Sequence, residues 1–392
     1  MKKTVVIGVT SSIATYKSVQ LVSDLIKKGY DVEVIMSKNA TNFIQPLTFS
    51  SLTKHKTYVE TFDREVDYDV EHISLAKKAD VFMIAPATAN VIAKVAHGLA
   101  DDMLTTTFLA STCPKIIAPA MNTKMYTNPI TQDNMKTCKS YGMSFVEPKT
   151  GLLACGDEGL GKLADIDTMI DAIDMALQEK KPLEGKRVLI SAGPTVEAID
   201  PVRFISNHSS GKMGYAIAKA ARNLGAHVTL ISGPVNLKQL NGVNTVNVKS
   251  AQDMAFHMKA HFPDCDYIVM AAAVADFTPE HVADEKIKKM DNQNTINLKK
   301  TEDILAYLGK QKTNQKICGF AMETQNVLEN AKRKFEEKNC DLLVVNDLKV
   351  EGAGFQGDTN KVTLIKKDGN KELELMSKDE LAYKILEELQ KV

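Results

Sequence analysis

Residues 4–12 read TVVIGVTSS, and this stretch decides how the first half of the chain folds. Thr4–Val9 is a short apolar run rich in β-branched residues, which is typical of a strand buried on both faces of a sheet. A Thr-Ser-Ser turn follows, and residues 13–28 then have the pattern of an amphipathic helix that ends at Gly29. A buried strand, a polar turn and a helix in this order indicate a parallel sheet covered by helices.

The same alternation continues along the chain and begins a second series near residue 187. Further strands are predicted at residues 31–36, 80–85, 115–118 and 143–146, and in the second series at 187–192, 226–232, 267–273, 317–321 and 342–345. The polar stretch QEKKPLEGKR, with Pro182 and Gly185, separates the two series. Since domains usually have about 100–200 residues, 392 residues favour two of them. We therefore predict an α/β fold with two doubly wound, Rossmann-like parallel-sheet domains, residues 1–182 and 183–392.

The composition excludes several classes of protein. Lys+Arg and Asp+Glu both total 49, and this net charge of zero argues against a nucleic-acid binder. No uninterrupted apolar stretch approaches the roughly 18 residues of a membrane span, and the apolar run at the N-terminus is too short for a signal peptide. The six cysteines are scattered, without a C-x-x-C pair, which predicts free thiols in a reducing, cytoplasmic compartment.

Loops of the first half suit a flat, phosphorylated cofactor. The turn Gly8–Ser12 lies where backbone N–H groups at a helix N-terminus bind phosphate, although an ordinary strand-to-helix turn with a serine cap has the same composition. It lacks the G-x-G-x-x-G pattern of dinucleotide sites. PATAN (Pro86–Asn90) and PAMN (Pro119–Asn122) each follow a predicted strand, where ligands of open α/β sheets bind. Their small residues either admit a planar ring or serve only helix packing.

The second half has an anion-binding pattern of its own. Ser191–Gly214 follows a strand, opens a helix and is rich in hydroxyls, glycines and cations. It does not fit the Walker pattern, because Lys212 is not followed by Ser or Thr. Residues 270–277, MAAAVADF, predict a buried strand that ends in small residues and in Asp276, a candidate metal ligand. On composition alone, the lysine-rich DEKIKK at residues 284–289 is a solvated surface segment.

Three motifs of the first half, PATANVIAK, PAMN and GLLACGDEGLGKLAD (Gly151–Asp165), resemble those of FMN-binding cysteine decarboxylases. From about residue 3 to the end, the chain resembles the bacterial bifunctional phosphopantothenoylcysteine decarboxylase/phosphopantothenate–cysteine ligases. The resemblance implies a flavodoxin-like decarboxylase domain (residues 1–182) and a ligase domain (183–392) that act in coenzyme A biosynthesis. It implies that cysteine is joined to 4′-phosphopantothenate through an acyl-cytidylate made from CTP, with release of pyrophosphate and CMP. FMN-dependent decarboxylation then yields 4′-phosphopantetheine.

The resemblance also implies the residues of both sites. The catalytic residues would be His72, Asn122, Cys155 on a glycine-rich flap, Asn207 and Lys286. The FMN contacts would be Gly8, Thr10, Ser11, Ser37, Ala87, Thr88 and Asn90. The CTP contacts would be Met270, Ala271, Ala272, Asp276, Lys286, Glu302, Asp303, Ile304, Leu305, Phe320, Lys334 and Lys338, and Asp276 would also bind Mg²⁺. Where the family often has glycine, this chain has Ser11 or Ser12, whose hydroxyl can still donate to phosphate.

For the assembly, the resemblance implies trimeric flavin domains, with the flavin at subunit contacts, and dimeric ligase domains. Together these contacts would build a homo-oligomer of twelve chains, a dodecamer. The expected partners are small molecules, 4′-phosphopantothenate, cysteine and CTP, with neither nucleic acid nor membrane among them. The choice of CTP over ATP follows from the resemblance alone, because no residue type by itself recognises cytosine.

Two other functions stay open on the sequence. An NAD(P)-dependent oxidoreductase would also have two nucleotide folds, but both turns lack the G-x-G-x-x-G pattern. A non-catalytic regulatory flavoprotein would keep the flavin and histidine motifs, whereas the Cys155 flap and the ligase motifs argue for an enzyme. His257 and His261 are spaced to share a helix face, but no third zinc ligand accompanies them, which favours surface histidines.

Overall fold

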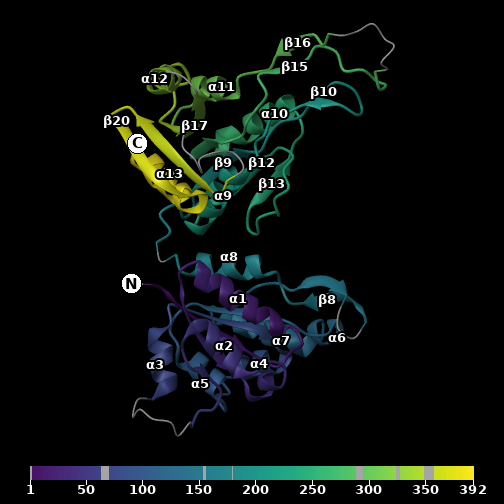
Figure 1. Ribbon diagram of the computed structural model, residues 1–392, viewed down its shortest axis with the longest axis vertical. Coiled ribbons are helices and arrows are strands. Elements are labelled where there is room, and N and C mark those ends of the chain that lie inside the picture. The colour runs from purple at the N-terminus through teal and green to yellow at the C-terminus, as the bar shows by residue number, and fades with distance from the viewer. Residues whose placement is uncertain are drawn as a thin grey trace. The chain divides into compact units, whose positions relative to one another are not determined.

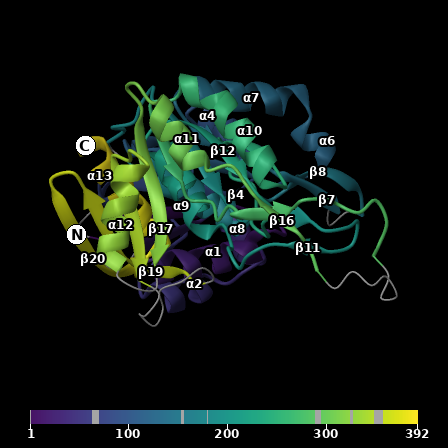
Figure 2. The same ribbon diagram turned by 90° about the horizontal axis from the view of Figure 1, so that it is seen from above.

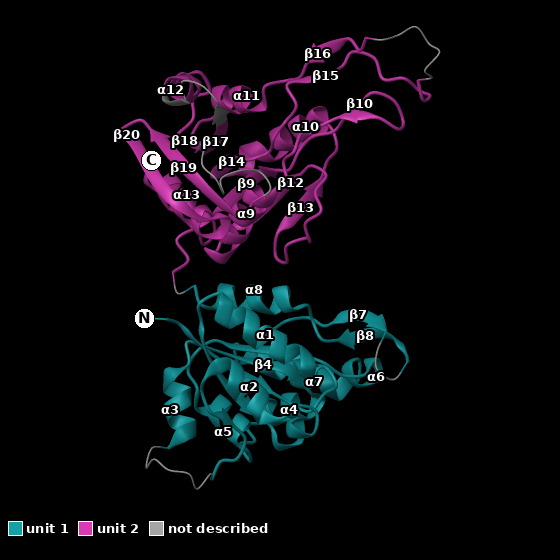
Figure 3. Ribbon diagram, in the orientation of Figure 1, with its two compact units in different colours: residues 1–179 teal, residues 180–392 magenta. Residues whose placement is uncertain are grey.

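The computed structural model describes residues 2–62, 70–152, 156–178, 180–287, 295–323, 327–347 and 357–392 (Figure 1). The chain divides into two compact units, residues 1–179 (unit 1) and residues 180–392 (unit 2) (Figure 3). Each unit has its own parallel sheet with helices on both faces, which confirms the predicted doubly wound α/β class. None of the helices in these described ranges is long and apolar enough to cross a membrane.

The described strands of unit 1 form a parallel sheet in the order β3-β2-β1-β4-β5-β6. They are β1 (Thr4–Val9), β2 (Asp31–Met36), β3 (Thr57–Tyr58), β4 (Val81–Ala87), β5 (Lys115–Pro119) and β6 (Ser144–Phe145). Without the two-residue edge strand β3, the strands follow the flavodoxin-like order 2-1-3-4-5. The strand order reverses between β1 and β4, and ligands of such sheets bind at the carboxyl ends of the strands where this reversal occurs.

Helices cover both faces of this sheet because successive residues of a strand point to opposite sides. They are α1 (Thr15–Lys27), α2 (Pro46–Thr53), α3 (Glu71–Lys78), α4 (Ala89–Ala96), α5 (Met103–Ala110), α6 (Thr123–Tyr126), α7 (Pro129–Ser140) and α8 (Ile166–Ala176), with a 3-10 helix at Lys38–Asn42. Val5, Ile7 and Val9 pack with α1, α2 and α8, whereas Val6 packs with α3, α4, α5 and α7. A hairpin of β7 (Lys149–Leu152) and β8 (Glu158–Lys162) contacts α6.

Unit 2 repeats this plan on a larger sheet, in the order β13-β12-β9-β14-β17-β18-β19-β20. Its strands are β9 (Arg187–Ala192), β12 (His227–Ser232), β13 (Asn244–Asn247), β14 (Tyr267–Met270), β17 (Lys316–Glu323), β18 (Leu342–Asp347), β19 (Thr359–Lys366) and β20 (Gly369–Ser377). The strands from β13 to β18 in this order are parallel, and the β19–β20 hairpin joins β18 antiparallel. Here the strand order reverses between β9 and β14.

Both faces of this second sheet are also buried. The helices are α9 (Lys212–Asn223), α10 (Ala251–His261), α11 (Ile304–Gln311), α12 (Val327–Glu337) and α13 (Lys378–Lys391), with a 3-10 helix at Phe262–Asp264. Ile190 of β9 packs with α9 and α13, and its neighbour Leu189 packs with α10, α11 and α12. α12 lies beside β17 (Figure 2).

Two short ribbons extend from the body of unit 2 as an arm (Figure 1). They are β10 (Glu197–Ala198) with β11 (Phe204–Ile205), and β15 (Phe277–Pro279) with β16 (Leu298–Lys300). We call residues 197–205, 277–287 and 295–300 the arm. Contacts between β10 and β15 join the two ribbons to each other.

The predicted strands are present in both units, with one exception: the strand predicted at 267–273, and the buried strand predicted over 270–277, end at Met270. Residues 271–273 leave the sheet there and line a cavity instead. The hairpin of β7 and β8 escaped prediction because its sequence contains Gly151, Gly159 and Gly161 rather than alternating apolar residues. The two ribbons of the arm escaped for a related reason, since strands of two or three residues are too short to show a period.

A buried carboxylate ties α13 to the β19–β20 hairpin and gives the first prediction. Glu388 is almost fully buried and accepts from Lys366 and Lys371 at 2.8 Å each and from Lys391 at 3.2 Å. The hydrogen bonds from Lys366 and Lys371 lower the pKa of Glu388 from 4.5 to about 2. A carboxyl group with a depressed folded-state pKa stabilises the fold above its unfolded-state pKa, and that contribution is lost as pH falls toward the folded-state value.

We expect Glu388→Gln to lower the unfolding free energy at pH 7 by about 1–3 kcal/mol, measured by urea denaturation and circular dichroism. The difference from the unaltered chain should shrink as pH falls from 4.5 toward 2, where the native carboxylate also becomes protonated. Glu387→Gln is the matched control, because Glu387 is about half exposed and its ion pair with Lys391 is worth less than about 1 kcal/mol. Equal costs for both variants, or a cost independent of pH, would contradict this account.

Candidate active sites

A buried threonine joins the two strands at which the order of the unit 1 sheet reverses. Thr10 follows β1, and its hydroxyl donates to the Pro86 carbonyl at 2.7 Å while accepting from the Thr88 backbone N–H at 3.1 Å. Ser18 of α1 donates to the Ala85 carbonyl at 2.7 Å. These buried hydroxyls hold the loop after β4 against the turn after β1.

A cavity of about 530 Å³ opens at this reversal of strand order. The turn after β1, the first turns of α1, the loops after β4 and β5, and the β7–β8 hairpin line it. The lining residues are Ser11, Ser12, Ile13, Ala14, Tyr16, Lys17, Thr88, Ala89, Ala120, Met121, Asn122, Met125, Leu152, Gly161, Lys162 and Leu163. The hairpin fits tightly here, because a Cβ atom on Gly161 would lie 2.2 Å from the Met121 carbonyl oxygen. Only glycine at that position allows so close an approach.

Two lysines give this largely apolar cavity a positive charge. Burial lowers the pKa of Lys17, and the nearby ammonium group of Lys162 lowers it further. Two cations that disfavour each other in one cavity favour an anionic ligand between them. Lys17 lies in the first turn of α1, directly after the polar turn, and this closeness to the predicted phosphate turn was its signal in the sequence.

The structure brings some of the predicted residues of unit 1 to this cavity. Ser11, Thr88 and Asn122 line it, and Asn122 caps α6 by accepting from the Lys124 N–H at 2.8 Å. Ser37 follows β2, donates its backbone N–H to the Val9 carbonyl at 2.9 Å and has a buried hydroxyl without a hydrogen-bond partner.

Other predicted residues of unit 1 lie elsewhere. Thr10 and Ala87 are buried behind the lining, Gly8 faces the core at Phe82, Ile84 and Leu104, and Asn90 is exposed on α4. His72 does not line the cavity, because α3 lies far from β7, β8 and α6 (Figure 3). Cys155 falls outside the described residues, between β7 and β8.

In unit 2, two fully buried hydroxyls have the same function at the second reversal of strand order. Ser191, on β9, accepts from the Ala272 N–H at 3.2 Å, and Thr195 accepts from the Ala275 N–H at 3.0 Å. The Thr301 hydroxyl donates to the Ala275 carbonyl at 2.6 Å. The loop after β14 is therefore fixed from both sides by side chains whose function the sequence did not reveal.

A cavity of about 480 Å³ lies beside that loop, between the start of α11, β17 and α12. Its lining residues are Met270, Ala272, Val274, Ala275, Asp276, Phe277, Lys300, Thr301, Glu302, Asp303, Ile304, Leu305, Phe320, Lys334 and Lys338. All the predicted CTP contacts are among them except Ala271, which lines a smaller adjoining cavity, and Lys286, which lines neither. Most of the predicted CTP contacts therefore line one cavity, although they come from segments that are far apart in the sequence.

The charges of this cavity are mixed. Lys338 lies 2.5 Å from Asp303, and Lys259 lies 2.5 Å from Glu302. Burial works to raise the pKa of Asp303, but the hydrogen bonds from Lys338 and the Ala306 N–H, with the charge of Lys338, outweigh it and leave the pKa lowered. Lys338, which directly follows α12, thus lines the cavity with a carboxylate partner that a more highly charged anion would replace.

The two remaining predicted residues of unit 2 lie apart from each other. Asn207 donates to the Ala273 carbonyl at 2.8 Å and accepts from the Ser209 N–H at 3.0 Å, which fixes it beside the loop after β14. Lys286 is exposed on the arm. The neighbouring Ile287 is held by its N–H to Asp200 at 3.2 Å and by its carbonyl to Arg203 at 2.9 Å.

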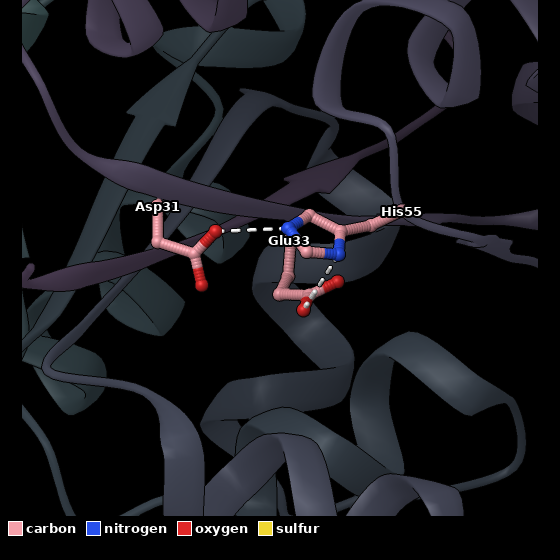
Figure 4. Close-up of side chains that lie close together, drawn as sticks. All are labelled: Asp31, Glu33 and His55. Atoms are coloured by element: carbon pink, nitrogen blue, oxygen red, sulfur yellow. Dashed lines mark hydrogen bonds and ion pairs between the residues drawn. The ribbon is translucent and has the colours of Figure 1, made fainter.

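One group of three side chains in the described residues, Asp31, Glu33 and His55, has ligand atoms close enough for a metal ion (Figure 4). His55 Nε2 lies 2.8 Å from Asp31, and Lys78 Nζ lies 2.9 Å from Asp31 and 2.5 Å from Glu33. Although burial works to raise it, the hydrogen bonds from Lys78 and His55 lower the pKa of Asp31. The ammonium group of Lys78, at the end of α3, thus already balances these carboxylates. This group of three side chains lies at the start of β2 and does not line the cavity.

Comparisons with known proteins cover both units. A family model described as "Flavoprotein" matches residues 1–178, and one described as "DNA/pantothenate metabolism flavoprotein C-terminal domain" matches residues 183–392. The chain is similar to the coenzyme A biosynthesis bifunctional protein CoaBC of Bacillus subtilis (strain 168), at 48% identity over 391 residues that cover 99% of this chain and 96% of that protein.

Two further relatives span most of the chain. The protein of the same name from Borreliella burgdorferi is 44% identical and covers 98% of each chain. A cysteine/cysteine sulfinic acid decarboxylase from an unknown prokaryotic organism is 45% identical over 88% of this chain and 98% of that protein. The matches to both halves, in one order and over nearly the full length, lead to one conclusion. The chain belongs to the family of bifunctional coenzyme A biosynthesis proteins, in which a flavoprotein domain precedes a DNA/pantothenate metabolism flavoprotein C-terminal domain.

Proposed function

We propose that the chain makes 4′-phosphopantetheine in two steps of coenzyme A biosynthesis. Residues 183–392 ligate cysteine to 4′-phosphopantothenate with CTP and Mg²⁺, and residues 1–182 decarboxylate the product with FMN. The strongest support is the gathering of nearly all the expected CTP contacts around one cavity of about 480 Å³. The relatives that share this chain's full length and two-domain order support the pairing of the two activities.

For the decarboxylase half, FMN fits the residues at the reversal of strand order. The unpartnered hydroxyl of Ser37 and the N–H groups at the start of α1 suit its phosphate, and Thr88 on the lining, with the small residue Ala87 behind it, suits its ring. When bound at these residues, FMN would supply the reversible two-electron oxidation of the substrate's cysteine moiety that loss of CO₂ requires. Asn122 would hold the substrate carboxylate, and Lys17 would add positive charge to an anionic substrate site.

Two further residues of this half have proposed catalytic roles. Cys155, in the segment between β7 and β8, would donate a proton to the decarboxylated product. His72 would position or deprotonate the substrate thiol. Since His72 lies far from the cavity of its own chain, we infer that a neighbouring subunit supplies it.

For the ligase half, Lys334 and Lys338 would bind the triphosphate of CTP, with Phe320 against the cytosine. Asp276 offers a carboxylate, the ligand type that Mg²⁺ prefers. Asn207, fixed beside the loop after β14, would orient the 4′-phosphopantothenate carboxylate for attack on the α-phosphate. Lys286 would stabilise charge as pyrophosphate leaves.

We infer that both sites are completed by other copies of the chain. Around the first cavity, Ile13, Tyr16 and Leu152 are each more than half exposed, although apolar. On the arm, Val202 and Phe204 are likewise exposed, and the arm also bears Lys286. Trimer contacts would cover the apolar surface around the first cavity, and a dimer contact would cover the arm. Together these contacts would join the chains into the dodecamer, and the dimer contact would bring Lys286 to the CTP cavity of a second copy.

The direct test is an assay of the purified chain with 4′-phosphopantothenate, cysteine, Mg²⁺ and either CTP or ATP, with products identified by mass. We expect CTP-dependent release of pyrophosphate and CMP, then CO₂ and 4′-phosphopantetheine. Chelation of Mg²⁺ by EDTA should stop the ligation while added 4′-phosphopantothenoylcysteine is still decarboxylated, because only triphosphate chemistry needs the metal. CO₂ released from free cysteine without CTP would instead assign a cysteine decarboxylase and contradict the proposal.

A subunit-mixing experiment tests the shared ligase site. Lys286→Gln and Asn207→Asp should each abolish ligation when expressed alone. Co-expressed in equal amounts with different tags, they should restore about a quarter of the unaltered activity, because half of the dimers are mixed and each mixed dimer has one intact site. The control is each variant co-expressed with itself. Activity that never exceeds the mean of the two variants would place Lys286 and Asn207 in sites formed by single chains.

A further inference from the structure

A second, smaller cavity adjoins the proposed CTP cavity in unit 2. Its volume is about 290 Å³, which lies at the lower end of ligand pockets and suits a small metabolite. The two cavities share the lining residues Ala272, Val274, Asp276, Phe320 and Lys334. A ligand in the smaller cavity would therefore lie next to the nucleotide, on the side toward α9 and the C-terminal hairpin.

One wall of this cavity favours a negative charge. Lys378, the first residue of α13, is 5% exposed and donates to the Gly357 carbonyl at 2.6 Å. Burial lowers the pKa of Lys378, and the ammonium group of Lys212 lowers it further. Lys212 opens α9, whose N-terminal N–H groups also favour an anion. Asp358 lies 2.7 Å from Lys212 and partly offsets this repulsion by raising the pKa of Lys378. A ligand carboxylate beside Lys378 would compensate the remaining positive charge and compete with Asp358 for Lys212.

A neighbouring amide, by contrast, requires a hydrogen-bond donor from the ligand. Asn360 lies on β19 and is only 2% exposed. Its amide nitrogen donates to Asn346 Oδ1 at 3.2 Å, and its own Oδ1 is buried without a hydrogen-bond partner. A buried acceptor without a partner is destabilising, so a ligand that donates an N–H to Asn360 Oδ1 would stabilise the cavity. A phosphate, which only accepts when fully ionised, would not meet that requirement.

The buried ammonium group of Lys378, the half-buried Lys212 and an unsatisfied acceptor together complement an α-amino acid, which has a carboxylate and an amine on one carbon. We propose that this smaller cavity binds the cysteine co-substrate of the ligase, with Lys378 and Lys212 holding its carboxylate and Asn360 Oδ1 accepting from its amine. The inference rests on the proposed ligase function. The amine nitrogen forms the amide bond as the acyl–phosphate bond breaks, CMP leaves with the electron pair, and the amine's proton passes to solvent.

The test separates the amino-acid site from the nucleotide site by comparing cysteine with cysteamine, which lacks the carboxylate. Lys378→Met should raise the KM for cysteine about tenfold or more, and should leave the kinetics with cysteamine within about twofold. Lys378→Arg retains the charge and should keep the KM for cysteine within about threefold of the unaltered value. Asn360→Leu removes the acceptor and should weaken both amines, since both donate an N–H to it.

Pyrophosphate release from CTP and 4′-phosphopantothenate, measured without any amine, serves as the internal reference. It should stay within about twofold of normal in each variant, because acyl-cytidylate formation precedes cysteine binding. Lys384→Met, on the exposed side of α13, is the matched control and should change nothing. A raised KM for CTP or 4′-phosphopantothenate with an unchanged KM for cysteine would overturn the inference. Absence of pyrophosphate release in the unaltered chain would instead overturn the ligase function itself.

Discussion

Buried hydroxyl groups at the two reversals of strand order are the interaction on which both sites depend. In each parallel sheet, neighbouring strands lead the chain away in opposite directions, which opens a crevice at their carboxyl ends. Thr10 closes the base of the first crevice, and Ser191 and Thr195 close the base of the second, each by bonding to the loop of the neighbouring strand. Because these loops are fixed, their small residues leave cavities of defined shape above them.

The two cavities differ in the charge that their surroundings supply. The cavity of unit 1 is mostly apolar, with the lysine pair Lys17 and Lys162 at one side, which suits a flat ring and an anionic substrate. The pair of cavities in unit 2 alternates cations with carboxylates and amides, which suits a triphosphate, a metal ion and a zwitterion. One fold plan thus supports two chemistries, because function is determined by the side chains at the loops rather than by the sheet.

Local sequence patterns predicted the sheets well, because a buried strand is recognisable from a few adjacent residues. They also identified the loops after β4 and β14, whose small residues stand out next to apolar strands. They could not reveal contacts that form only in the folded chain. Lys378 and Asn360 meet the loop after β14 from a C-terminal segment about a hundred residues away in the sequence, and no period or motif marks them. The positions of His72 and Lys286 away from the cavities were also beyond local patterns, since they depend on where α3 and the arm lie.

The central claim is that the two units perform separate, successive reactions, and a chain altered in one unit tests it most directly. The Cys155→Ser chain, supplied with 4′-phosphopantothenate, cysteine, CTP and Mg²⁺, would be analysed by mass spectrometry for acyl products, CMP and CO₂. The account predicts that 4′-phosphopantothenoylcysteine accumulates, with matching CMP release and little 4′-phosphopantetheine. Loss of CTP-dependent ligation in this folded variant, or undiminished formation of 4′-phosphopantetheine, would contradict the division of the chemistry between the two units.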